Sequence, residues 1–268
     1  MPVNYDQAVS FYDATRGYRD GVVERYREAL LDVTGMDASA RFLELGIGSG
    51  LIAQAFYPFA RSYVGIDFSL GMMRLIRGKL AGDRRPLLAQ ADARYLPFVA
   101  GSFDIVHAVR VFHHLLNWRA CIDEARRLLG NGGALVIVEM IPPAGAGRPP
   151  WALVQDRWDE ILRGLGVSSD EGRDQGIWLT DDAMRQYIEA TGGRADVLDL
   201  LRYLEKPVSP RIMVERRAAG MFSSDWRLPE AIHQEASRAL RDWLERDCEA
   251  PDDMVEREML FRALIARW

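Results

Sequence analysis

The stretch that decides the fold reads Arg41-Phe42-Leu43-Glu44-Leu45-Gly46-Ile47-Gly48-Ser49-Gly50. An apolar strand runs into an acidic residue, and a Gly-x-Gly-x-Gly turn then opens a helix. Glycines in such a turn let a ligand approach the backbone, where a Cβ atom would collide with it. The carboxylate of Glu44 would repel a dinucleotide pyrophosphate but attract a ligand that carries an ammonium group. The stretch therefore favours an ammonium-bearing ligand over NAD.

Three further predicted strands also end in polar residues. The second strand leads to Asp67, whose carboxylate can accept hydrogen bonds from both hydroxyls of a ribose. The third leads to Asp92, which is placed to accept a hydrogen bond from the amine of adenine. The fourth, residues 103–109, runs into Arg110. Ligands of doubly wound sheets bind outside the carboxyl ends of the strands, where all these residues lie.

These four strand ends, in this order, resemble class I methyltransferases that use S-adenosylmethionine (SAM). The likeness is greatest to the branch with the ubiquinone and menaquinone biosynthesis methyltransferases, through Asp-Ala-x-x-Leu-Pro-Phe at 92–98 and Ser-Phe-Asp-x-Val at 102–106. It covers residues 40–140 closely and the rest loosely. The resemblance implies a doubly wound, seven-stranded, mostly parallel α/β sheet, the Rossmann-like methyltransferase fold, with a helical lid. It also implies SAM as cofactor and S-adenosylhomocysteine as product.

Composition limits the remaining possibilities. The chain has 268 residues, 49% of them hydrophobic, which is enough for a full α/β core. A net charge of −5 argues against general affinity for nucleic acid. Two cysteines are too few for a disulfide framework or a zinc cluster, and no metal is expected. Without an export signal or a membrane-spanning run, we expect a cytoplasmic monomer or homodimer that does not insert into membranes.

The sequence pattern predicts a division of the chain into four segments. Two helices, Tyr5–Tyr18 and Asp20–Leu31, form an N-terminal cap over residues 1–35, and the SAM-binding core follows at 36–141. A Pro/Gly-rich linker then opens a helical insertion or lid at 142–193. Residues 194–268 complete the sheet edge and add further cap helices. We expect the segments before the first strand and after the fifth to meet over the ligand edge, as a lid that excludes water.

The resemblance also implies which residues bind the cofactor. In the first helix, Arg16 would clamp the carboxylate of SAM, because a guanidinium pairs bidentately with a carboxylate. Arg110 departs from the small or apolar residue expected at its position. It could reach the carboxylate of SAM or an anionic substrate, or form a surface salt bridge. The cofactor-binding candidates are Tyr12, Arg16, Glu44, Gly46, Gly48, Gly50, Asp67, Phe68, Met72, Asp92, Ala93, Val109 and Arg110.

Two adjacent histidines are the candidates for catalysis. His113 and His114 follow the fourth strand, and either could accept a proton from a hydroxyl nucleophile. The alternative for both is a structural hydrogen bond. Glu139, at the end of the fifth strand, could do the same work or merely bind a loop. An apolar acceptor pocket could be lined by aromatic residues of the later segments, although core packing is the favoured explanation for most of them: Trp151, Trp158, Trp178, Tyr203 and Trp226.

The function favoured by these features is methyl transfer to a small-molecule acceptor in a lidded apolar pocket. A nucleic-acid or protein methyltransferase is the alternative enzyme, although the Asn/Asp-Pro-Pro-Tyr segment that cradles a flipped base is absent after the fourth strand. A SAM-binding protein without catalysis also stays open. An NAD-dependent reductase is disfavoured by Glu44 and by the glycine spacing. The sequence does not identify the acceptor or the atom that is methylated.

Overall fold

The computed structural model describes residues 5–80, 85–149, 152–167 and 179–268, which divide into two compact units. The sheet unit comprises residues 1–141, 176–203 and 259–268, and the helical unit comprises residues 142–175 and 204–258. Helix α8 and most of strand β6 therefore belong with the sheet. None of the helices within the described ranges is long and apolar enough to cross a membrane.

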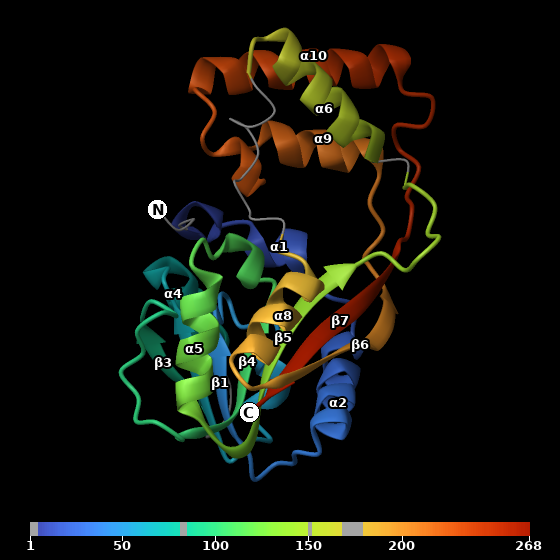
Figure 1. Cartoon of the computed structure of the whole chain (residues 1–268). Coiled ribbons are helices and arrows are strands. Elements are labelled where there is room, and N and C mark those ends of the chain that lie inside the picture. Colours follow the sequence, from blue (N-terminus) through green and yellow to red (C-terminus); the bar gives the residue numbers. More distant parts are fainter. Residues whose placement is uncertain (1–4, 81–84, 150–151, 168–178) are drawn as a thin grey trace. The chain divides into compact units, whose positions relative to one another are not determined.

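The sheet unit contains a seven-stranded sheet with the order β3-β2-β1-β4-β5-β7-β6 (Figure 1). Strands β1 to β5 pair in parallel, and β7 runs antiparallel to β5. The seven-stranded, mostly parallel sheet expected from the sequence is confirmed. The strands are β1 (Arg41–Leu45), β2 (Ser62–Asp67), β3 (Leu87–Gln90), β4 (Phe103–Val109), β5 (Leu129–Ile141), β6 (Arg194–Leu204) and β7 (Glu258–Arg267).

Helices cover both faces of this sheet, as near-continuous apolar strands require. Successive strand residues point to opposite faces, so Phe42 packs in the cluster with α2 and α3 while Leu43 packs in the cluster with α5 and α8. The helices of this unit are η1 (Tyr5–Ala8), α1 (Tyr12–Arg16), α2 (Val22–Thr34), α3 (Ala53–Phe56), α4 (Leu70–Lys79), η2 (Phe112–His114), α5 (Trp118–Leu128) and α8 (Asp181–Ala190).

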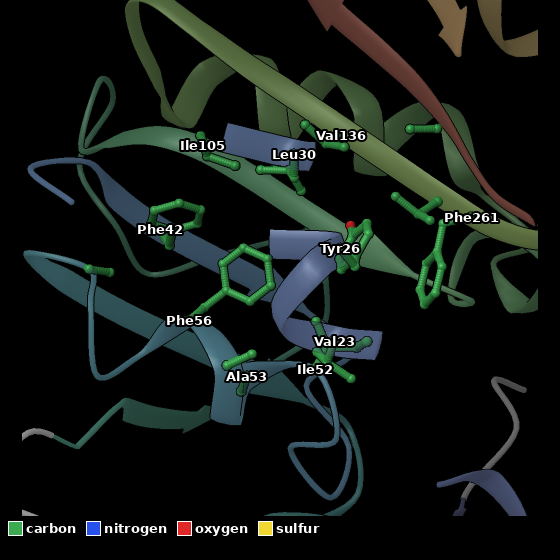
Figure 2. Packing of buried hydrophobic residues seen from close by; sticks show 14 of the residues in the cluster. Val23, Tyr26, Leu30, Phe42, Ile52, Ala53, Phe56, Ile105, Val136 and Phe261 are labelled. Carbon is green, nitrogen blue, oxygen red and sulfur yellow. The ribbon is translucent and has the colours of Figure 1, made fainter. Parts of the chain in front are cut away.

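Helix α2 shows how the sequence pattern produces this packing. Val22, Val23, Tyr26 and Leu30 recur at helical spacing, and all four are buried. Figure 2 shows Tyr26 among the strand and helix side chains of this core, and its ring stacks on that of Phe261 at 4.5 Å between centroids. The helix begins after one left-handed glycine and ends at another, which is the usual way for a helix to stop.

The helical unit packs α6 (Ala152–Gly164), α9 (Pro210–Ala218) and α10 (Glu230–Asp247) around its own apolar core, with a short turn η3 (Ser223–Asp225). Trp158 is buried in that core. Arg217 is buried too and pairs with Asp225 at 2.7 Å, so neither buried charge is left alone.

Several sequence predictions need correction. The single helix predicted over Tyr5–Tyr18 is two short turns, η1 and α1. Strand β5 begins at Leu129, directly after α5, and so includes the Gly-rich residues 130–133. Of the aromatic residues considered for an acceptor pocket, Trp158 and Tyr203 pack in cores, and the indole of Trp226 donates to the carbonyl of Gly220 at 2.7 Å. Trp151 and Trp178 lie outside the described residues.

Candidate active site

The carboxyl ends of the central strands meet at one edge of the sheet. Register pairs Leu45 of β1 with Ile66 of β2 and with Ala108 of β4. Gly46 follows β1, and Asp67 and Val109 are the last residues of β2 and β4, so the three are neighbours along the edge. The sequence analysis predicted this meeting from the order of the motifs.

The turn after β1 has a positive φ at each of its three glycines, a backbone conformation that favours glycine. Gly46, Gly48 and Gly50 have φ values of +67°, +55° and +80°. A Cβ on Gly46 would lie 2.5 Å from Val111, and one on Gly50 would lie 2.4 Å from Ile76. A Cβ on Gly48 would meet nothing closer than 3.9 Å. The turn is thus packed on two sides and open at Gly48, where a ligand can approach the backbone.

Asp67 fixes this turn from the end of β2. One carboxylate oxygen accepts from the backbone N–H of Gly48 at 2.8 Å, and the other accepts from that of Ser69 at 2.8 Å. Burial raises the pKa of Asp67, while these backbone donors oppose the shift. Each carboxylate oxygen has a second lone-pair site, so both can still accept from the hydroxyls of a ribose.

Glu44 lies inside the sheet unit rather than on its open edge. The side chain is 2% exposed and accepts a hydrogen bond from the hydroxyl of Tyr63 at 2.6 Å. Burial raises the pKa of Glu44 to about 8. Its cross-strand neighbour His107 is no counter-charge, because burial lowers the pKa of that imidazole to about 3. Glu44 is therefore a buried carboxylate that a cationic ligand group would stabilise in its ionised form.

Asp92 has a partner that the sequence analysis did not predict. Its carboxylate accepts from the guanidinium of Arg94 at 2.6 Å and from the backbone N–H of Arg94 at 2.9 Å. The side-chain hydrogen bond with Arg94 is the main reason that the pKa of Asp92 is lowered. An adenine amine would have to share this carboxylate with Arg94, which lies two residues away in the chain.

The N-terminal turns are bound to the same edge by two aspartates. Asp6 accepts from the hydroxyl of Ser69 and from the backbone N–H of Gly71, at the start of α4. Asp13 accepts from the hydroxyl of Ser49 in the glycine turn and from Lys79 at 2.6 Å. Sequence reasoning missed both aspartates as contacts of the site. The only available signal was their place in a segment expected to cover it.

Tyr12 connects this N-terminal segment with the strand ends. Burial raises the pKa of Tyr12, and the charged groups that act on it next are Arg110, Arg16, Asp67 and Asp13. Tyr12 is therefore close enough to Arg110, Arg16 and Asp67 for their charges to act on it.

The other cofactor candidates differ in accessibility. Phe68 is 48% exposed beside Asp67, and its ring is available for stacking. Met72 is 1% exposed in α4, so its side chain is already packed within the protein. Ala93 and Val109 are half-buried at the ends of their strands.

Both histidines after β4 are held by hydrogen bonds. Nδ1 of His113 lies 3.0 Å from a carboxylate oxygen of Glu139, at the end of β5. Nε2 of His114 lies 2.8 Å from the hydroxyl of Tyr5, and the two imidazole centroids are 3.9 Å apart. Glu139 and Tyr5 thus orient two imidazoles next to each other at the ligand edge. Tyr5 is a member of the site that the sequence analysis did not single out.

The described residues show no group of three or more His, Cys, Asp or Glu side chains that could hold a metal ion. The polar groups at the edge instead fit a nucleoside carrying an amino acid. Gly48 leaves space at the backbone, Asp67 keeps acceptor sites for a diol, and Glu44 is a buried carboxylate beside an uncharged histidine.

Comparison with protein families decides the class. Residues 43–137 match the model described as a methyltransferase domain. These residues resemble a methyltransferase domain over less than half of the chain. The match begins within β1 and ends within β5, so it includes every strand end described above except the end of β5. SAM is accordingly the cofactor of this domain.

Individual relatives agree with this assignment. The chain is 32% identical over 165 residues to a demethylmenaquinone methyltransferase of Clavibacter sepedonicus, covering 61% of this chain and 65% of that one. It is 33% identical over 132 residues to a malonyl-[acyl-carrier protein] O-methyltransferase of Geobacter sulfurreducens, covering 48% of each. The chain thus spans between about half and two thirds of the length of these relatives.

The fold is shared more widely. An N-methyltransferase of Haemonchus contortus, solved with phosphomonomethylethanolamine and S-adenosylhomocysteine, superposes with a TM-score of 0.54 at 18% identity. The match covers 97% of this chain and 57% of that one. At this identity the likeness shows the methyltransferase fold alone.

Proposed function

We propose that this protein transfers the methyl group of SAM to a small-molecule acceptor. The observation that carries the proposal is the arrangement at the sheet edge, where a glycine turn fixed by Asp67 lies beside two oriented imidazoles. The similarity to a demethylmenaquinone methyltransferase and to a malonyl-[acyl-carrier protein] O-methyltransferase supports it. Both names describe acceptors other than nucleic acid, which agrees with the net charge of −5.

In this proposal, each strand end holds one part of the cofactor. Gly46, Gly48 and Gly50 lie under the methionine portion, and Glu44 receives its ammonium group directly or through water. Asp67 accepts from the ribose hydroxyls, with Asp92 and Ala93 at the adenine edge and Phe68 against the ring. Met72 contributes only from within α4. The remaining cofactor contacts come from Tyr12, Arg16 and Val109, whereas the sequence left Arg110 open between the cofactor, an anionic substrate and a surface salt bridge.

For this reaction the protein mainly has to position the reactants and exclude water. When bound, SAM supplies an activated methyl group on a sulfonium, and an in-line acceptor atom can take it without a strong catalyst. Where the acceptor atom is a hydroxyl oxygen, His114 or His113 removes its proton. Tyr5 and Glu139 hold these imidazoles in place, so each base acts from a fixed orientation.

We also propose that the first two helices and residues of about 145–235 act as a lid when the cofactor binds. The sequence supports this, because a Pro/Gly-rich linker follows Ile141 and catalytic lids are joined by such segments. Exclusion of water protects a reactive sulfonium from the wrong nucleophile.

Methyl transfer from radiolabelled SAM tests the proposed function. The purified protein is incubated with a deproteinised small-molecule extract, with bulk RNA and DNA, or with bulk protein. Label should enter the small-molecule fraction, and calorimetry should show micromolar-scale binding of S-adenosylhomocysteine without binding of NAD. Label in nucleic acid or protein would establish the alternative acceptor class. Cofactor binding without transfer to any fraction would indicate a SAM-binding protein that is not an enzyme.

A further inference from the structure

Arg110 has the most unusual backbone at the ligand edge. Its φ is +57°, and it is the one non-glycine residue of the described ranges in the left-handed region. That conformation is strained for an L-residue with a Cβ, because the Cβ approaches the following carbonyl oxygen. The backbone N–H of Arg110 donates to the carbonyl of Val138 at 2.8 Å and so keeps the residue against β5. Strain of this kind persists where the surroundings fix a side chain for a purpose.

The guanidinium of Arg110 has no carboxylate partner. Elsewhere in the sheet unit, Arg41 pairs with Asp104, Arg94 pairs with Asp92, and Arg127 pairs with Glu124. No described residue forms an ion pair or a side-chain hydrogen bond with Arg110. The side chain of Arg110 is exposed to solvent.

The groups around Arg110 point to an anion. Burial lowers the pKa of Arg110, but Tyr12, Tyr18, Glu139 and Tyr5 together outweigh this effect, so the pKa is raised. The guanidinium therefore stays charged beside the phenolic side chains of Tyr12, Tyr18 and Tyr5. Among the described residues, Glu139 pairs with His113 at 3.0 Å rather than with Arg110.

The position of Arg110 along the edge separates it from the cofactor groups. The residues proposed for the cofactor's glycine loop, ribose and adenine follow β1, β2 and β3, on one side of β4. The charged or phenolic neighbours of Arg110 lie on the other side or in the N-terminal segment. Glu139 is in β5, and the hydroxyl of Tyr18 lies 4.0 Å from the sulfur of Met140, also in β5. An acceptor must approach from this side if the cofactor lies over β1 to β3.

We propose that Arg110 binds a carboxylate group of the acceptor, so that the acceptors of this enzyme are small organic acids. The inference rests on the proposed function and adds the substrate class to it. A planar guanidinium holds a carboxylate by two parallel hydrogen bonds, which fixes orientation as well as charge. The carboxylate serves as an anchor whether the methyl group goes to it or to another atom of the acceptor.

Matched acids and amides test this proposal. Protein loaded with S-adenosylhomocysteine is titrated with benzoate and benzamide, 4-hydroxybenzoate and its amide, and octanoate and octanamide. At least one acid should bind about tenfold or more tightly than its amide. Arg110→Gln and Arg110→Gly should each lose that preference while binding S-adenosylhomocysteine as the wild type does. The glycine variant relieves the positive φ, so it keeps the test valid if the glutamine variant folds poorly.

Arg61→Gln is the control, because Arg61 is an exposed arginine at the opposite end of the strands and the change removes the same charge. It should bind acids like the wild type. Equal binding of every acid and its amide would overturn the proposal, as would a loss of S-adenosylhomocysteine affinity in the Arg110 variants as large as the loss of acid affinity. The latter result would place Arg110 on the cofactor. Failure of the wild type to bind S-adenosylhomocysteine would instead overturn the proposed function itself.

Discussion

The two ends of the parallel strands use charged residues in opposite ways. At the amino end, Asp104 accepts from the backbone N–H of Arg41 at 2.8 Å and from its guanidinium at 2.7 and 3.0 Å. A hollow of about 450 Å³ lies here, lined by Asp37, Arg61 and their neighbours. Arg41 and Asp104 of its lining are already paired with each other, and Asp37 accepts from Ser39, so these groups have less capacity left for a ligand.

At the carboxyl end, the polar groups are held in place yet keep capacity for a ligand. Arg110 is strained and has no carboxylate partner, Glu44 is buried without a counter-charge, and Gly48 leaves open space at the backbone. The strained backbone of Arg110 and the burial of Glu44 each cost free energy in the absence of a ligand. The comparison teaches that polar groups that are held in place but not fully paired identify the functional end of the sheet better than the presence of a hollow does.

The largest expected effect distinguishes substitutions at two glycines that both have a positive φ. Gly48 at the carboxyl end and Gly35 at the amino end have φ values of +55° and +69°. A Cβ on Gly48 would lie no closer than 3.9 Å to another atom, and a Cβ on Gly35 would meet nothing within 4 Å. Alanine at either position should therefore destabilise the protein by about 1–2 kcal/mol through backbone strain alone. Only Gly48→Ala should weaken S-adenosylhomocysteine binding by about 100-fold or more in calorimetry, since its Cβ enters the ligand's space. Equal affinities of the two variants would place the ligand elsewhere.

A pair of aspartates gives a somewhat smaller contrast. Asp67→Asn should weaken S-adenosylhomocysteine binding by about 1–3 kcal/mol, because it loses a charged acceptor of hydrogen bonds. It should also lower stability slightly, since Asp67 holds Gly48. Asp104→Asn should cost about 1 kcal/mol of stability, for a partly exposed pair, and leave the affinity unchanged. Urea unfolding and calorimetry on both variants distinguish the effects. A cofactor defect in Asp104→Asn alone would reverse the assignment of the two ends.

Glu44 should make the stability of the protein depend on pH. The pKa of Glu44 is raised from 4.5 to about 8, so between these values the folded protein keeps a proton that the unfolded chain has released. Stability should then fall as the pH rises through this window, by up to about 1.4 kcal/mol per pH unit from this group. Glu44→Gln should remove that part of the slope in urea unfolding at pH 5, 6, 7 and 8. An identical slope in the variant would show that Glu44 is ionised in the folded protein.

The same carboxylate gives a test of the ammonium contact. A cationic group near Glu44 favours ionisation, so S-adenosylhomocysteine binding at pH 7 should release up to about one proton. Calorimetry in two buffers of different ionisation enthalpy measures this number. Glu44→Gln should bind without that release, and proton release unchanged in the variant would assign it to another group.

The smallest expected effect concerns the proposed lid. Hydrogen exchange in the two N-terminal turns, in α2 and in the described parts of 145–235 should slow when S-adenosylhomocysteine is added, more than in strands β1 to β5. Exchange that slows only around the glycine turn and Asp67 would mean that these helices do not close over the cofactor.

The sequence sufficed for features that depend on local pattern. The glycine turn, the strand ends at Asp67 and Asp92, and the buried face of α2 follow from periodicity and from the backbone freedom of glycine. It did not predict contacts between distant residues, such as Asp13 with Ser49 or Tyr5 with His114, since nothing in a local pattern specifies a tertiary partner. The short pairing of Asp92 with Arg94 was missed for another reason, because an Asp-x-Arg spacing is common on surfaces.

A crystal structure of the protein with S-adenosylhomocysteine tests the central claim most directly. The account predicts that the homocysteine lies over Gly48, that the ribose hydroxyls donate to Asp67, and that Arg110 stays free of the ligand's carboxylate. A ligand bound at the amino end, in the hollow beside Asp104 and Arg61, would contradict the account.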